Sequence, residues 1–278
     1  MRAVVTGHKG YIGCHLYKAL LEDDACTRLV GLDLKDNMDI RRSLPKENFD
    51  TVFHFAANPR VGYSVEHPSQ TLNDNVYATS VLLEWAKDHG VKRVIFSSSS
   101  AVLGQGDGIP TSPYGLHKLQ SEMEMRLYAK LYGLDSVCLR YFNVYSKDQP
   151  FGGSYSTAIC AWYSLMKEGK SLRMDGTGEQ TRDFIHVDDV VSANLHFASL
   201  EGKFEGMGIE IGTGTSMSLT EIKDIIDNNH EVNWEFAPPR EGDVLHTKAN
   251  TSIAKSYGWE AKIMPREGIE AIFKKEDK

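Results

Sequence analysis

From residue 2 to residue 141 the sequence alternates short runs rich in β-branched residues with longer stretches of helical periodicity. The strand-like runs cover 2–6, 28–33, 51–55, 93–97 and 136–141, and the helical stretches cover 11–21, 72–89 and 114–132. This alternation is typical of a parallel sheet with helices on both faces. It predicts an α/β fold with a doubly wound parallel sheet, in which ligands bind beyond the carboxyl ends of the strands.

The rhythm changes after residue 145. Residues 146–156 are rich in Gly, Pro and Ser and predict a loop, and further helices are expected at 157–168 and 187–199, followed by a strand that ends at Ile211. We therefore expect two domains. Residues 1–150, with about 184–213, form the larger one, and residues 151–183 and 214–278 form a small interleaved one.

The composition is that of an ordinary soluble protein and excludes several classes. A net charge of -7 argues against a broad nucleic-acid surface, and no apolar run approaches the ~20 residues of a membrane span. The four cysteines form no CxxC pair and lie at no ligand spacing from a histidine, so no metal site is expected. The sequence shows no signal peptide, and we expect a cytoplasmic protein.

A glycine-rich turn joins the first strand to the first helix. Gly7, Gly10 and Gly13 allow a tight turn and a close backbone approach, and the free N–H groups of the helix suit a pyrophosphate. Asp33 ends the second strand, where a carboxylate binds a ribose diol and repels a 2′-phosphate. This pattern predicts NAD rather than NADP, with a purely structural turn and a solvated strand end as the alternatives.

A second constellation follows the fourth strand. Ser97–Ser100 ends that strand, and Tyr114 and Lys118 lie four residues apart, on one face of a helix. An ammonium nearby stabilises a phenolate, so this pair suits a tyrosine that acts as a base. The alternative for the serines is a simple turn.

Together these motifs resemble the extended short-chain dehydrogenase/reductases, which have a Rossmann fold, and specifically their nucleotide-sugar epimerase branch. The resemblance rests on TGxxGxxG at 6–13, the acid at 33, HFAA at 54–57, the serine run, YxxxK and LRYFNVY at 139–145. It continues through GTGEQTRDFIHVDDV at 176–190, IGTG at 211–214 and REGDV at 240–244, in family order and over essentially the whole chain.

The resemblance implies roles for individual residues. The catalytic set is Ser99, Tyr114 and Lys118. The NAD contacts are Gly7, Gly10, Tyr11, Ile12, Asp33, Asp39, Ile40, Phe55, Ala56, Ala57, Ser97, Tyr114, Lys118 and Tyr141. The substrate contacts are Ser99, Asn143, Arg182, Arg240, Asp243 and Thr247. For the two arginines the alternatives to substrate binding are structural: Arg182 forms a salt bridge with Asp183, and Arg240 lies in a solvated loop. The resemblance also implies a homodimer formed by the helices at 72–89 and 114–132.

The expected reaction is 4-epimerisation of a UDP-hexose or UDP-N-acetylhexosamine, with Tyr114 as base. Dehydratases and decarboxylases of this family need an acid just after Ser99, where this chain has Ser100 and Ala101. A reductase of a 4-keto nucleotide sugar and a non-catalytic NAD-sensing protein are the alternatives.

The chain departs from its family pattern at several places. The stretches 33–39 and 100–114 are short, and Gly62 replaces a family arginine, for which Arg60 is a candidate substitute.

Overall fold

Six strands of the computed structural model form one sheet with the order β2-β1-β3-β4-β5-β9. The registers of β2 with β1, β1 with β3, β3 with β4, and β4 with β5 are all parallel. The order in which successive strands are added to the sheet reverses between β1 and β3, which is the topological switch point of such folds. The strands are β1 (Arg2–Thr6), β2 (Arg28–Leu32), β3 (Thr51–His54), β4 (Arg93–Ser99), β5 (Asp135–Tyr141) and β9 (Met207–Ile211).

The structure describes residues 1–151, 157–239 and 245–275. Its contacts divide the chain into two units, Met1–Tyr141 with Val190–Ile209, and Phe142–Asp189 with Glu210–Lys278. Placing cofactor binding and substrate binding in separate domains, with boundaries near 150, 184 and 213, remains a prediction.

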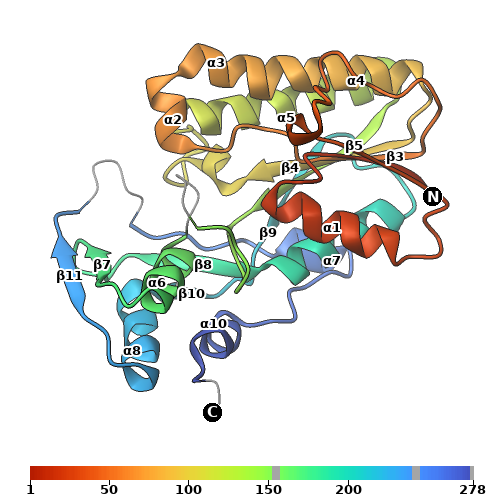
Figure 1. Cartoon of the computed structure of the whole chain (residues 1–278). Helices are drawn as coiled ribbons and strands as arrows, with labels where there is room; N and C mark the ends of the chain where they lie inside the picture. The colour runs from red at the N-terminus through yellow and green to blue at the C-terminus, as the bar shows by residue number, and fades with distance from the viewer. Residues whose placement is uncertain (152–156, 240–244, 276–278) are drawn as a thin grey trace. The chain divides into compact units, whose positions relative to one another are not determined.

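Helices cover both faces of the six-stranded sheet. Figure 1 shows α2 to α5 on one face and α1 and α7 on the other. Because both faces are covered, β1 and β3 to β5 are almost wholly buried, which confirms the predicted doubly wound α/β fold. The helices are α1 (Tyr11–Leu21), α2 (Val61–Glu66), α3 (Pro68–Leu72), α4 (Ala78–Asp88), α5 (Pro113–Tyr132) and α7 (Val187–Ser199), with short 3₁₀ turns at Leu34–Asp36 and Ser100–Leu103.

The single helix predicted over 72–89 is instead interrupted. Helix α3 is followed by one wide π-helical turn, η2 (Asn73–Tyr77), before α4 begins. Asn75 lies in this turn, and its side-chain amide pairs with the backbone of Asn58 at 2.6 and 2.9 Å. The wide turn therefore fixes the loop that follows β3, a typical use of π-helical bulges at functional sites.

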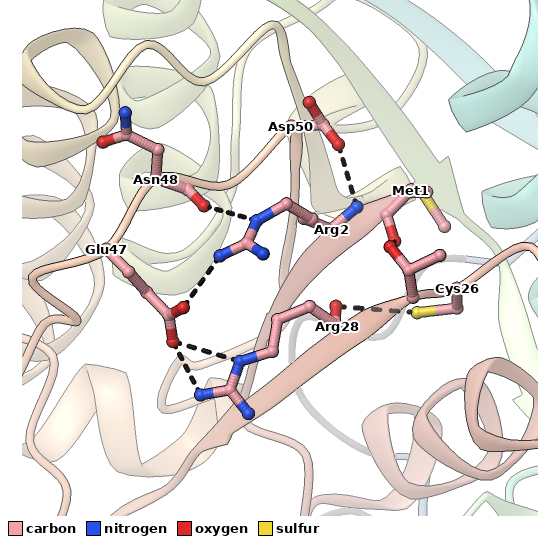
Figure 2. Close-up of polar contacts among 8 residues, drawn as sticks. Met1, Arg2, Cys26, Arg28, Glu47, Asn48 and Asp50 are labelled. Carbon is pink, nitrogen blue, oxygen red and sulfur yellow. Dashed lines mark hydrogen bonds and ion pairs between the residues drawn. The ribbon is translucent and has the colours of Figure 1, made fainter.

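Polar contacts tie the loop before β3 to the starts of β1 and β2 (Figure 2). Glu47 bridges Arg2, at 2.8 Å, and Arg28, at 2.6 Å. Arg2 also donates to the carbonyl of Asn48, and its backbone N–H donates to Asp50. Because these pairs are exposed, their contribution to stability is small, and their effect is to order the loop.

The second unit holds two small sheets. One has the order β10-β8-β6, with β8 (Thr181–His186) antiparallel to β10 (Ser216–Ser218) and parallel to β6 (Asn143–Tyr145). The other pairs β7 (Leu172–Asp175) with β11 (Trp234–Ala237). Its helices are α6 (Ala158–Lys167), α8 (Leu219–Asn229), α9 (Ser252–Ser256) and α10 (Pro265–Phe273).

A separate core holds this unit together. Trp162, Phe184 and Phe273 are among its fully buried side chains. The N-terminus of α8 is closed by a capping box between Ser218 and Glu221. Strands β6, β7 and β8 are not anticipated by the sequence pattern, because runs this short carry little periodicity.

In the described ranges no helix is both long and apolar enough to cross a membrane.

Candidate active site

The glycine turn after β1 lies at the switch point of the sheet. Gly7 has a φ of +72°, and a Cβ there would lie 2.8 Å from the backbone N of Ala56. A Cβ on Gly13 would lie 2.2 Å from the carbonyl oxygen of Gly7. The turns after β1 and β3 therefore touch through their backbones, and side chains at these positions would separate them.

Helix α1 begins directly behind this turn. Gly10 is its N-cap residue, and the half-buried Tyr11 and Ile12 are its first residues. The first N–H groups of a helix have no partner within the helix, and the dipole favours an anion in front of them. The turn and the helix end therefore form a cradle that fits the pyrophosphate of a dinucleotide.

Asp33 lies where the sequence analysis expects the ribose-binding acid. It follows β2 and caps the short 3₁₀ turn, so that one carboxylate oxygen accepts from the N–H of Lys35 at 2.9 Å. The other accepts from the N–H of Lys9 at 3.0 Å, which ties Asp33 to the glycine turn.

Two further predicted cofactor residues follow along the chain. Asp39 binds Arg41, whose guanidinium lowers the pKa of that carboxyl group, and Arg41 also binds Asp74 at 3.1 Å. Ile40 is buried in the core.

The loop that follows β3 carries Phe55, Ala56 and Ala57, all half-buried. The N–H of Ala56 donates to the hydroxyl of Thr6, and that hydroxyl lies 2.7 Å from Nδ1 of His54. Nε2 of His54 lies 3.0 Å from the hydroxyl of Thr79, which donates to the carbonyl of Asn75. A buried polar chain thus connects this loop to the π-helical turn.

The predicted catalytic set is assembled in the first unit. Ser99 ends β4, and Tyr114 and Lys118 lie one turn apart on α5. Tyr114 is buried, and the side chain of Ser99 acts on it by lowering its pKa. A backbone hydrogen bond also holds Tyr114 in place, because its N–H donates to the hydroxyl of Ser64 at 3.0 Å.

Burial dominates the pKa values in this set. It raises the pKa of Tyr114, against the lowering effect of the Ser99 hydrogen bond. It lowers the pKa of Lys118 to about 8, with Glu122 acting in the opposite direction. The sequence analysis expects Lys118 to lower the pKa of Tyr114, but the ammonium instead donates to the carbonyl of Ser97 at 2.6 Å and lies 4.7 Å from the ring centroid of Phe96.

The sequence analysis missed the carboxylate behind this lysine. Glu122 is fully buried and accepts from the hydroxyl of Ser98 at 2.6 Å. It also accepts two hydrogen bonds from the guanidinium of Arg140, at 2.9 and 2.7 Å. Its place four residues after Lys118, on the same helix face, is the signal that would have found it.

Tyr141, the last residue of β5, has its hydroxyl 3.0 Å from the side-chain oxygen of Asn194 and is also hydrogen-bonded to Ser97. Gly62 is the second residue of α2, where a Cβ would meet no atom within 4 Å, and Arg60 is the N-cap residue of this helix. A side chain at position 62 is therefore sterically possible.

In the second unit, Asp183 organises the region around the predicted substrate residues. Its buried carboxylate accepts from the backbone of Thr213, Gly214 and Ala249, at 2.9 to 3.1 Å. Asn143 donates to the carbonyl of Asp183 at 3.0 Å.

The other substrate candidates are placed as follows. Arg182 donates to the carbonyls of Thr181 and Leu245. Thr247 is held by a backbone hydrogen bond to Thr181, and within the described chain its hydroxyl is buried without a hydrogen-bond partner. Arg240 and Asp243 lie outside the described residues.

The chain is similar to known proteins over most of its length. A family model described as the NAD dependent epimerase/dehydratase family matches residues 3–212. The UDP-glucose 4-epimerase of Halalkalibacterium halodurans is 32% identical over 308 residues, which cover 94% of this chain and 91% of that protein.

Two solved structures are similar throughout. The UDP-N-acetylglucosamine 4-epimerase of Methanobrevibacter ruminantium has a TM-score of 0.85 at 30% identity, with 97% of each chain covered. A variant of the UDP-glucuronic acid 4-epimerase of Bacillus cereus, solved with NAD, has a TM-score of 0.86 at 28% identity, with 98% of each chain covered. The resemblance seen in the motifs, and NAD as the cofactor, are confirmed.

Proposed function

Because the chain belongs to the NAD dependent epimerase/dehydratase family, we propose that it inverts C4 of a UDP-linked hexose or N-acetylhexosamine. The observation that carries this proposal is the buried Tyr114, whose pKa the side chain of Ser99 lowers, with Lys118 one turn further along the same helix. These three side chains provide a proton acceptor, a hydroxyl that shares its proton, and a cation.

The chemistry assigned to these residues is the movement of one proton. When bound, NAD would supply the acceptor, and later the donor, of a hydride at C4 of the sugar. Tyr114 takes the proton of the 4-hydroxyl as the C4–H bond breaks, and it returns the proton when this bond is rebuilt. Ser99 stabilises the developing phenolate by its hydrogen bond, which lowers the pKa of Tyr114.

The residues after Ser99 favour epimerisation over elimination. Ser100 and Ala101 begin the 3₁₀ turn at the end of β4, and neither can act as a general acid near neutral pH. Loss of water or of a carboxylate needs such an acid. The sugar is therefore expected to leave the site with all of its substituents and with C4 inverted.

We assign the remaining roles by position. The NAD contacts are Gly7, Gly10, Tyr11, Ile12, Asp33, Asp39, Ile40, Phe55, Ala56, Ala57, Ser97, Tyr114, Lys118 and Tyr141. The substrate contacts are Ser99, Asn143, Arg182, Arg240, Asp243 and Thr247, with the two arginines on the diphosphate, because guanidinium groups match phosphate oxygens.

We further propose a homodimer that forms through α5. An apolar stripe runs along one side of this helix. Its members Met123, Leu127 and Leu131 are each at least half exposed, and Leu116 extends it. Such a row of large apolar side chains on an amphipathic helix is typical of an interface. Leu119, on the same helix, is half-buried.

The proposal is tested with a panel of UDP-, GDP- and dTDP-sugars, using NMR to detect a C4-inverted product. Tyr114→Phe removes the proton acceptor and is expected to lower turnover by at least about 10²-fold, the usual scale of acid–base catalysis. NAD binding, measured by calorimetry, is expected to persist. Tyr132→Phe, at the exposed end of the same helix, is the matched control and should keep full activity.

The alternatives give different results in the same assay. A reductase of a 4-keto sugar consumes reduced cofactor in proportion to product, whereas an epimerase leaves the cofactor unchanged. An NAD-sensing protein binds cofactor and converts no sugar. Turnover by Tyr114→Phe within a few-fold of the wild type would exclude Tyr114 as the base.

A further inference from the structure

Five charged or polar side chains gather where the turn after β2 meets the glycine turn. We call this set, His8, Lys9, Asp33, Lys35 and Asp36, the ribose-end cluster. Its members come from two segments, because residues 33–37 form only a short 3₁₀ turn that keeps Asp36 close to the glycine turn. The cluster therefore surrounds the acid to which the ribose is assigned.

The backbone fixes Asp33 within this cluster. Each of its carboxylate oxygens already accepts one N–H, from Lys9 and from Lys35. An ionised carboxylate has about four acceptor positions, so room remains for a ribose diol. The ammonium of Lys35 donates to the carbonyl of Lys9 at 2.9 Å, which holds a positive charge beside the same turn.

Asp36 contacts both Lys9 and His8. It forms an ion pair with the ammonium of Lys9, and one of its oxygens lies 3.2 Å from Nε2 of His8. The His8 ring is seated against Gly31, where a Cβ would lie 2.5 Å from the ring. Within the described chain Nδ1 of His8 is buried without a hydrogen-bond partner, and Nε2 is the ring nitrogen that faces Asp36.

The charges of the cluster balance. Lys9 and Lys35 supply two positive charges, and Asp33 and Asp36 supply two negative ones. A 2′-phosphate bound beside Asp33 would add nearly two negative charges and would need a free cation to offset them. The backbone N–H of Lys9 donates to Asp33, and the ammonium of the same residue is paired with Asp36.

We propose that Asp36 is a second determinant of NAD over NADP, because it pairs with Lys9 and so withholds that ammonium from a 2′-phosphate. In this arrangement Asp33 repels the phosphate and Asp36 occupies the ammonium of Lys9, while the ammonium of Lys35 is held by the carbonyl of Lys9. The inference rests on the proposed function, since that places the adenosine ribose of NAD at Asp33.

Calorimetric titrations with NAD and with NADP test this inference. Asp36→Asn keeps the shape of the side chain and frees Lys9, and it is expected to shift the ratio of dissociation constants toward NADP by about fivefold, the scale of an exposed ion pair. The shift should shrink at high salt, which screens exposed charges. Asp24→Asn, which removes the same charge from the exposed loop before β2, should leave the ratio unchanged.

Lys9→Gln provides a second, independent arm. In the presence of Asp36 it should change the ratio little, and combined with Asp36→Asn it should abolish the gain. The inference is overturned if Asp36→Asn leaves the ratio of the NAD and NADP dissociation constants unchanged, or if the shift toward NADP survives when Lys9 is replaced. In either case the proposed function stands as long as the protein binds NAD. A wild-type protein that binds neither dinucleotide overturns both.

Discussion

The buried histidine at the end of β3 has one consistent protonation state. The hydroxyl of Thr79 donates to the carbonyl of Asn75, so it can only accept from Nε2 of His54. Nδ1 is then the acceptor for the hydroxyl of Thr6, which in turn accepts from the N–H of Ala56. His54 is therefore neutral, with its proton on Nε2, and it orients the loop assigned to the cofactor.

This assignment predicts how His54 responds to acid. Burial lowers the pKa of His54 to about 3. An unfolded histidine takes up its proton near pH 6.5, so the unfolded state binds more protons between the two values and stability falls as the pH drops through this window. NMR of ring-labelled histidine should show His54 with the Nε2–H tautomer at pH 5.

A matched pair of variants checks the same hydrogen-bond chain. Thr79→Val keeps the shape of the side chain but leaves Nε2–H unpaired, which is expected to cost about 1–3 kcal/mol of the free energy of unfolding. Thr111→Val, at an exposed threonine, should cost little. Protonation of His54 near pH 6.5 would contradict the assigned chain.

Thr247 offers a test of substrate size. Its backbone is fixed by Thr181 and by Ser216, and its side chain is small. By family resemblance this position lies beside the sugar, so a threonine leaves room for a 2-acetamido group. Thr247→Tyr is expected to lower kcat/KM for UDP-N-acetylhexosamines relative to UDP-hexoses by about 10- to 100-fold, the scale of small-group discrimination. An equal loss of kcat/KM for both substrates would mean that Thr247 has a structural role only and does not select the sugar.

At the scale of elements, α5 serves two sides of the molecule. Its inner side carries the buried Tyr114, Lys118 and Glu122, and its outer side carries the apolar stripe. Sedimentation of Leu127→Gln should show a dimer dissociation constant raised by about 10²-fold, because the change removes an apolar side chain from both copies of the proposed interface.

Leu21→Gln is the control for this experiment. Leu21 is a 64% exposed leucine at the end of α1, in the layer on the other face of the sheet. It should leave the dimer intact. A wild-type protein that sediments as a monomer at micromolar concentration would refute the proposed interface.

The sequence predicts its long periodic elements well and its short ones poorly. The helix expected over 187–199 is α7, and the helix expected over 114–132 gains only Pro113. The pattern over 72–89 hides the π-helical turn, because one extra residue per turn barely changes the apolar period. The strands β6 to β8 are only three to six residues long, and tertiary pairing rather than local pattern determines them.

At the scale of the whole molecule, the sequence predicts those site residues that lie at the ends of strands. Residues that follow a strand, such as Gly7, Asp33 and Ser99, are found from the strand pattern alone, because carboxyl ends of parallel strands share one edge. Glu122 and Asp36 escape this reasoning. Their partners Arg140 and Lys9 are distant in sequence, and only the folded chain brings them together.

The chain leaves the first unit after Tyr141 and returns to it only at Val190. Strand β9, which pairs with β5, begins at Met207, after 65 intervening residues. At roughly 5–20 residues per second, a ribosome needs about 3–13 s to synthesise that stretch. During this time β5 is the outermost strand of a nascent sheet, with its hydrogen-bonding groups open to any other chain that emerges nearby.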